Sequence, residues 1–118
     1  MEKSIFLMET DDVLRDNITE LLELEGYSVT SLTLDEAKST FQNYHVGLLI
    51  FNMHTLAEPV HSFIRFIKNK VDGIAVLCSD EDDPQIDEAD IKIILPFGYD
   101  ELLNKLSEFN STNAVTGV

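Results

Sequence analysis

Carboxylate, amide and hydroxyl groups stand directly after three apolar runs of this sequence. They are Glu9, Thr10, Asp11 and Asp12 after the run 4–8, Asn52 after the run 46–51, and Ser79 after the run 73–78. Carboxylate oxygens bind hard cations, and a carboxylate can act as a nucleophile that accepts a transferred group. Asn52 instead offers a neutral amide at the end of the apolar segment VGLLIFN. What the chain can do depends on why an amide stands there.

These residues need a scaffold, and the rest of the sequence indicates one. Compact apolar or β-branched runs predict strands at 4–8, 27–32, 46–51, 73–78 and 91–95. Between the strands, apolar residues recur at helical spacing. The signals for the starts and ends of these helices are Thr10 or Asp11, Gly26, the capping box TLDE at 33–36, and Pro59 as a first helical residue. Strands that are apolar on both faces are typical of a parallel sheet covered by helices. We therefore expect a doubly wound α/β domain with its functional residues at the carboxyl ends of the strands.

Together these segments resemble the receiver domain of bacterial response regulators over nearly all of 4–109. The first strand, acidic turn, first helix and second strand are matched by FLMETDDVLRDNITELLELEGYSV, and the phosphoacceptor strand by VGLLIFNMHT. The fourth strand with its hydroxyl residue is matched by AVLCSD, and the fifth strand, Pro-Phe turn and last helix by ADIKIILPFGYDELLNKL. The resemblance implies a flavodoxin-like, five-stranded parallel sheet in the order 2-1-3-4-5. It also implies a signalling role, because receivers are phosphorylated on one aspartate beside a Mg²⁺ ion.

The chain departs from that family at its phosphorylation site. Asn52 stands where the phosphorylated aspartate should be, Thr10 where the main metal-binding aspartate should be, and Leu95 where a lysine precedes Pro96. An amide has no nucleophilic carboxylate oxygen, and the charges that stabilise phosphoryl transfer are reduced. The resemblance therefore implies a degenerate phosphoacceptor pocket, with no metal and no cofactor, formed by Glu9, Thr10, Asp11, Asn52, Ser79 and Leu95.

The amide of Asn52 also has a physical rationale. A carboxylate buried at this position without a metal or a lysine would cost several kcal/mol or would be forced to bind a proton. An amide keeps the shape and the hydrogen bonding without the charge. We expect Asn52 to hydrogen-bond to neighbouring backbone and to Thr10 or Ser79, in a fold that is already in its working conformation without phosphorylation.

The connection between the fourth and fifth strands is the second anomaly. Its sequence, SDEDDPQIDEAD, has one large apolar residue, Ile86, so the helix that receivers carry there is predicted to be shortened or lost. A solvated acidic loop that only aids solubility is the slightly favoured interpretation of this segment. The alternative is docking of a basic protein surface. Lys92 falls where receivers often carry a switching aromatic residue, and the candidate partner-binding residues are Asp80, Glu81, Asp82, Asp83, Asp87, Glu88, Lys92, Phe97 and Tyr99.

Length, charge and cysteine content set further limits. The 118 residues suit one domain, which we place at 1–109, followed by a flexible tail at 110–118. The formal net charge of −14 would repel nucleic acid and anionic membranes, so we expect neither as a partner. The start of the chain lacks the pattern of a secretory signal, and the single Cys78 suits a cytoplasmic protein.

The remaining candidates favour ordinary structural roles. Cys78 is predicted to be a small buried core residue, and His45, His54 and His61 to be surface residues. Glu9, Asp11 and Asp12 could bind a cation weakly, but stabilisation of a helix N-terminus is the favoured interpretation. Residues 53–57 are expected to form a mildly apolar rim beside the pocket. The sequence shows no hydrolase triad around Ser79 and no Gly-rich phosphate loop.

These observations favour a phosphorylation-independent pseudo-receiver that acts as a protein-interaction module in bacterial signalling or transcriptional control, and not as an enzyme. Its expected partner is a signalling or regulatory protein, and a homodimer stays open. Two alternatives also stay open. One is a receiver phosphorylated on a non-standard acid such as Asp11 or Asp80, and the other is a flavodoxin-like domain whose emptied pocket binds a small neutral molecule.

Overall fold

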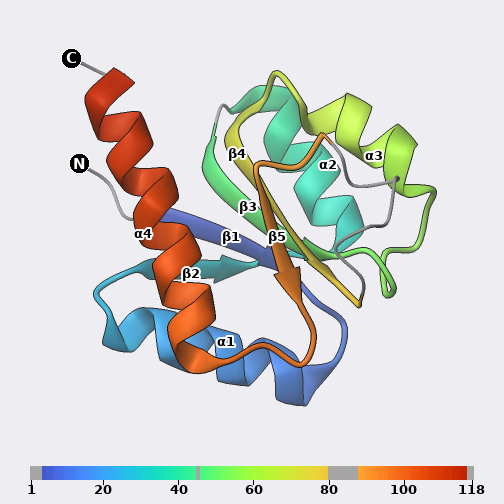
Figure 1. The fold of residues 1–118 in the computed structure, drawn as a ribbon. Helices are drawn as coiled ribbons and strands as arrows, with labels where there is room; N and C mark the ends of the chain where they lie inside the picture. The colour runs from blue at the N-terminus through green and yellow to red at the C-terminus, as the bar shows by residue number, and fades with distance from the viewer. Residues whose placement is uncertain (1–3, 45, 80–87, 117–118) are drawn as a thin grey trace.

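The computed structural model describes residues 4–44, 46–79 and 88–116 as a five-stranded parallel sheet with helices on both faces (Figure 1). The strands are β1 (Ser4–Met8), β2 (Ser28–Ser31), β3 (Val46–Asn52), β4 (Val71–Cys78) and β5 (Ile91–Ile94). The helices in these residues are α1 (Asp12–Leu24), α2 (Leu34–Asn43), α3 (Val60–Ile67) and α4 (Tyr99–Thr116). The strand order is β2-β1-β3-β4-β5, and every neighbouring pair is parallel. The predicted doubly wound α/β fold, with this strand order, is confirmed.

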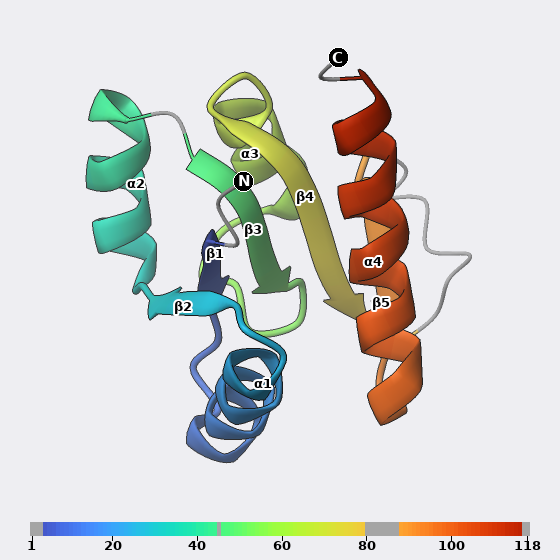
Figure 2. The same cartoon turned by 90° about the vertical axis from the view of Figure 1, so that its left-hand side faces the viewer.

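The central strands bury apolar side chains on both faces of the sheet. In β3, Leu49 and Phe51 pack with α2 and α3, whereas Leu48 and Ile50 pack with α1 and α4. The views in Figures 1 and 2 show the same division of the helices into two layers. The rings of Phe51 and Phe63 meet edge to face with their centroids 5.2 Å apart. Burial on both faces holds the end of β3, and therefore Asn52, in a fixed position.

Local signals in the sequence set the helix ends. Asp11 is the N-cap of α1, and its side chain accepts hydrogen bonds from the backbone N–H groups of Val13 and Leu14. Gly26 follows α1 with a φ of 93°, a left-handed conformation that glycine adopts without strain. Thr33 and Glu36 form the predicted capping box of α2.

Three boundaries differ from the sequence-based predictions. Strand β2 spans Ser28–Ser31, shorter than the predicted 27–32, and its residues Ser28, Thr30 and Ser31 are exposed at the edge of the sheet. Pro59, predicted as the first helical residue, is the N-cap of α3, so this helix begins one residue later, at Val60. Helix α4 continues to Thr116, into the segment 110–118 that the sequence predicts to be a flexible tail.

The predicted shortening or loss of the helix between the fourth and fifth strands falls on residues 80–87, which lie outside the described residues. From Glu88 onward the chain is described again, and the carboxylate of Asp90 accepts a hydrogen bond from the backbone N–H of Ile74 at 2.8 Å. Among the helices of the described ranges, none is long and apolar enough to cross a membrane.

Candidate functional site

The carboxyl ends of β1, β3 and β4 bring the predicted site residues together. In the strand register, Met8 lies opposite Phe51, and Asn52 lies opposite Leu77. Glu9 and Ser79 are the next residues after β1 and β4, so they flank the end of β3 on its two sides. Glu9 and Asn52 are the buried polar residues among those described, with 5% and 6% of their surface exposed.

The Glu9 carboxylate is held by three hydrogen bonds from within the chain. Its Oε1 accepts from the backbone N–H of Asp11 at 2.9 Å and from the hydroxyl of Thr55 at 3.1 Å. Its Oε2 accepts from the side-chain amide of Asn52 at 2.7 Å. Hydrogen bonds to an ionised acceptor are short and strong, so these donors replace the water that the carboxylate loses on burial.

Asn52 uses both ends of its amide. Its Nδ2 donates to Glu9, and its Oδ1 accepts from the backbone N–H of His54 at 2.8 Å. The expected bond to backbone is therefore present, but the expected side-chain partner, Thr10 or Ser79, is wrong. Glu9 reaches Asn52 across the β1–β3 pair, and Ser79 is engaged by a different residue.

That residue is His54, whose Nε2 lies 3.0 Å from the hydroxyl oxygen of Ser79. Both side chains are exposed, as predicted for His54, and the contact links the loop after β3 to the end of β4. Sequence reasoning placed His54 and Thr55 in the rim beside the pocket but predicted no hydrogen bond of either side chain to Ser79 or Glu9. The only sequence signal for a role of these two residues is their position, two and three residues after Asn52, where β3 ends.

The remaining pocket residues predicted from the sequence take structural positions. The side chain of Asp11 caps α1, and Thr10 is exposed. Leu95 is partly buried and packs against the core cluster beneath α1 and α4. Its backbone N–H donates to the carbonyl of Cys78 at 2.7 Å. The structure thus brings Glu9 and Asn52 into direct contact, and packs Leu95 against the apolar core.

The predicted partner-binding residues are spread over several elements. Asp80, Glu81, Asp82, Asp83 and Asp87 lie outside the described residues. Glu88 pairs with Lys68 at 3.3 Å, and Phe97 is partly buried against the α1 and α4 side of the core. Lys92 lies in β5, and its backbone carbonyl accepts from the Lys105 ammonium. Tyr99 begins α4.

A small pocket opens beside Asn52, at the carboxyl end of β1, between the turn after β2 and the loop after β3. Its volume is about 60 Å³. It is lined by Met8, Glu9, Thr10, Leu32, Thr33, Leu34, Asn52, Thr55, Leu56 and Ala57. The expectation of a mildly apolar rim at 53–57 is met in part, because Leu56 and Ala57 form one wall. The other wall comes from the turn between β2 and α2, which sequence spacing alone could not place there.

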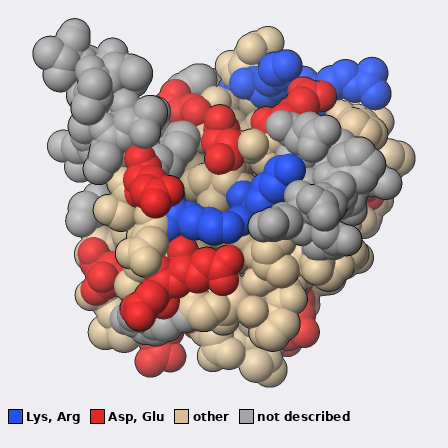
Figure 3. Space-filling view, in the orientation of Figure 1, with Lys and Arg blue, Asp and Glu red and all other residues tan. Residues whose placement is uncertain are grey.

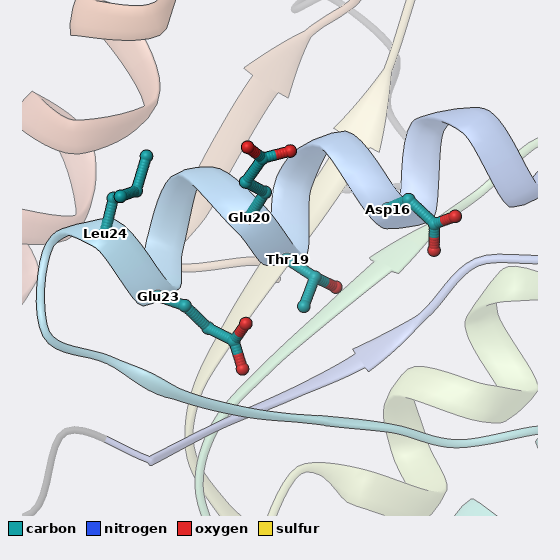
Figure 4. A pocket seen from close by; sticks show the side chains of 5 residues that line it. All are labelled: Asp16, Thr19, Glu20, Glu23 and Leu24. Atoms are coloured by element: carbon teal, nitrogen blue, oxygen red, sulfur yellow. The ribbon is translucent and has the colours of Figure 1, made fainter.

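A second hollow, of about 440 Å³, lies on the outer side of α1 and is lined by Asp16, Thr19, Glu20, Glu23 and Leu24. Figure 4 shows that Glu20 and Leu24 point to one side of the helix, and Thr19 and Glu23 to the other. Because these side chains do not converge, this hollow offers no set of groups that could hold one ligand.

Comparisons with known proteins bear on the fold. No family model matches the chain, and no curated protein matches its sequence. Its solved structural neighbours are response regulators. TrrA from Thermotoga maritima, crystallised with Mg²⁺ and BeF, has a TM-score of 0.75 and 23% identity, covering 92% of this chain and 98% of TrrA.

The signal receiver domain of an HD domain-containing protein from Pseudomonas fluorescens has a TM-score of 0.74 and 18% identity, covering 98% and 99% of the two chains. The chemotaxis response regulator CheY4 of Vibrio cholerae has a TM-score of 0.73 and 16% identity, covering 92% and 98%. The chain has the fold of response regulator receiver domains. At these low sequence identities, the likeness shows a shared fold and nothing beyond it.

The residues at this site do not fit the magnesium ion that such domains are expected to hold. Mg²⁺ requires near-octahedral oxygen ligands at about 2.0–2.1 Å. Here both oxygens of Glu9 already accept hydrogen bonds from the chain, with one acceptor place left on Oε2, and Asp11 Oδ1 caps α1. In the part of the chain that the structure describes, no three His, Cys, Asp or Glu side chains come together as a metal site.

Proposed function

We propose that the chain is a degenerate, phosphorylation-independent receiver domain that acts by binding a protein partner, and not by catalysis. The observation that supports this most directly is the pairing of Asn52 with Glu9. The residue at the end of β3 is a neutral donor that satisfies a buried carboxylate, where phosphoryl transfer would need a carboxylate nucleophile beside a cation.

The surroundings support the same function. Leu95 supplies packing in place of a cation, because its side chain joins the apolar core under α1 and α4. Asp11, the non-standard acid that the sequence left open as a phosphoacceptor, has its Oδ1 engaged by two backbone N–H groups. The net charge of −14 favours a protein partner with a basic surface.

The test is incubation of the native chain with acetyl phosphate and Mg²⁺, followed by intact mass measurement. We expect no gain of a phosphoryl group, and no discrete NMR shifts around Asn52 on addition of beryllofluoride with Mg²⁺. A Mg²⁺-dependent gain of one phosphoryl group would refute the proposal.

The matched control is a triple variant, Thr10→Asp, Asn52→Asp and Leu95→Lys, which restores the metal acid, the acceptor and the lysine. We expect this variant to gain the phosphoryl group under the same conditions. Its reaction would show that the assay detects a working site on this scaffold.

A further inference from the structure

The pocket beside Asn52 contains a buried carboxylate, and no basic side chain is among the described residues that line the pocket. Glu9 is 5% exposed and is the one charged residue among the described residues that form the pocket walls. Its three hydrogen-bond donors are neutral: one backbone N–H, one hydroxyl and one amide. A positive charge brought from outside would therefore interact with a carboxylate that is itself largely removed from water.

The hydrogen-bonding capacity of the pocket is not fully used by these contacts. Each carboxylate oxygen can accept two hydrogen bonds. Oε1 of Glu9 accepts two, from Asp11 and Thr55, whereas Oε2 accepts one, from Asn52. The Thr55 hydroxyl donates to Glu9 and keeps its own acceptor capacity. The pocket thus offers unused hydrogen-bond acceptor positions on Oε2 of Glu9 and on the hydroxyl oxygen of Thr55.

Half of the residues that line the pocket are apolar. Five of its lining side chains carry no polar atom that forms an ordinary hydrogen bond, and they are Met8, Leu32, Leu34, Leu56 and Ala57. A volume of about 60 Å³ suits a chain of a few methylene groups. An ammonium on an alkyl stem combines three donors with an apolar body. A guanidinium fits less well, because its planar fork pairs best with two free carboxylate oxygens.

We propose that this pocket binds a primary ammonium group on a short alkyl stem, with the ammonium at Glu9 and the stem between Leu34 and Leu56. The inference rests on the proposed function in one respect, since it treats the pocket as one that holds neither a phosphoryl group nor Mg²⁺. The ammonium can come from a lysine side chain of a protein partner or from a free small amine.

The test is a titration of the isotope-labelled native chain, without Mg²⁺ or phosphodonor, followed by amide chemical shifts. n-Butylammonium and n-butanol are the matched probes, because they share a stem and differ in charge. We expect saturable shifts with n-butylammonium at residues 8–10, 32–34 and 55–57, and binding of n-butanol at least about tenfold weaker. No saturable shifts at these residues, or equal binding of the two probes, would overturn the proposal.

Three variants locate the site. Glu9→Gln removes the charge, and Ala57→Leu fills the pocket without changing Glu9. We expect each to weaken n-butylammonium binding at least about tenfold. Glu20→Gln removes the same charge from the outer side of α1 and should leave binding unchanged. If Glu9→Gln fails to fold, Ala57→Leu decides the question, because unchanged binding by this variant in its folded state would refute the assignment.

A last comparison separates the two sources of the ammonium. N-acetyl-lysine methylamide presents a lysine side chain as it occurs in a protein. Saturable binding of this compound at the same residues would support a partner lysine, whereas binding of n-butylammonium alone would support a free amine. Failure of these titrations is distinct from failure of the proposed function, which a phosphoryl gain in the mass experiment would show.

Discussion

At the scale of single residues, the pair of Glu9 and Asn52 defines this molecule. One is a buried acceptor and the other a buried donor, and their atoms meet at 2.7 Å. In the described residues, no buried side-chain nitrogen or oxygen lacks a hydrogen-bond partner. The two side chains are therefore matched to each other, and a change in one alters the energy of the other.

The substitution Asn52→Asp tests this match. It replaces the amide donor by a second carboxylate, in contact with Glu9 and without a cation among the residues that line the pocket. We expect the free energy of unfolding at pH 7 to fall by about 3 kcal/mol. Urea denaturation followed by circular dichroism measures the change.

The control is Asn104→Asp, which makes the same chemical change at an exposed position of α4. We expect this substitution to change the free energy of unfolding by less than about 0.5 kcal/mol. Equal effects of the two substitutions would contradict the view that Asn52 is needed as a neutral donor.

At the scale of elements, the start of α1 shows why acids after β1 need not bind a metal. The side chain of Asp11 accepts from Val13 N–H at 3.0 Å and from Leu14 N–H at 3.2 Å, and so satisfies two of the free donors at the helix start. Glu9 receives the backbone N–H of Asp11 itself. The acidic turn is thus a capping structure that connects β1 to α1.

Substitutions of Asp11 separate capping from charge. Asp11→Ala removes the cap, and we expect the free energy of unfolding to fall by about 1 kcal/mol. Asp11→Asn keeps a capping oxygen without the charge, and we expect a loss of less than about 0.5 kcal/mol. Thermal or urea unfolding of the two variants measures this difference. Equal losses would indicate that the charge, and not the cap, is what α1 requires.

At the scale of the whole molecule, the 22 acidic residues far outnumber the 8 basic ones. Figure 3 shows acidic side chains gathered over the region of α1 and α4, with a short strip of basic side chains across the middle of that face. The radius of gyration is 13.3 Å. At low ionic strength the screening length is about 30 Å, which exceeds this radius, so the acidic side chains repel one another across the entire domain.

Salt should therefore stabilise the native chain. We expect the urea midpoint to rise when NaCl is increased from about 0.01 M to about 0.3 M, because screening weakens this self-repulsion. NaCl is preferred to MgCl₂, since a monovalent salt separates screening from divalent-ion binding. A midpoint that falls with NaCl would show that favourable ion pairs, such as that of Arg15 with Asp12, outweigh the repulsion.

The sequence predicts the fold well because its signals are local or periodic. Apolar runs such as VGLLIFN locate the strands, and Thr33 with Glu36 marks the start of α2. The order of the strands came from resemblance and could not follow from hydrophobic patterns alone. The bounds of β2 could not be predicted from hydrophobic patterns either, because the burial of this strand depends on its place at the edge of the sheet.

The candidate site was predictable in its position but not in its contacts. That Glu9, Asn52 and Ser79 gather at one edge follows from parallel strands. The pairing of Asn52 with Glu9 and of His54 with Ser79 was not predictable, because it depends on side-chain length and on the path of the loop after β3. The pocket wall from Leu32 to Leu34 depends likewise on a turn whose geometry no periodicity describes.

The hydrogen bond between Glu9 and Asn52 has a consequence for how the chain folds. It joins the ends of β1 and β3, and it can form only when these strands are aligned as observed, with Met8 opposite Phe51. A nascent sheet in which β1 slid by one position along β3 would separate Glu9 from Asn52 and Thr55, and would leave this carboxylate with only the local donor of Asp11. The pair thus favours the observed register of β1 and β3 over a shifted one.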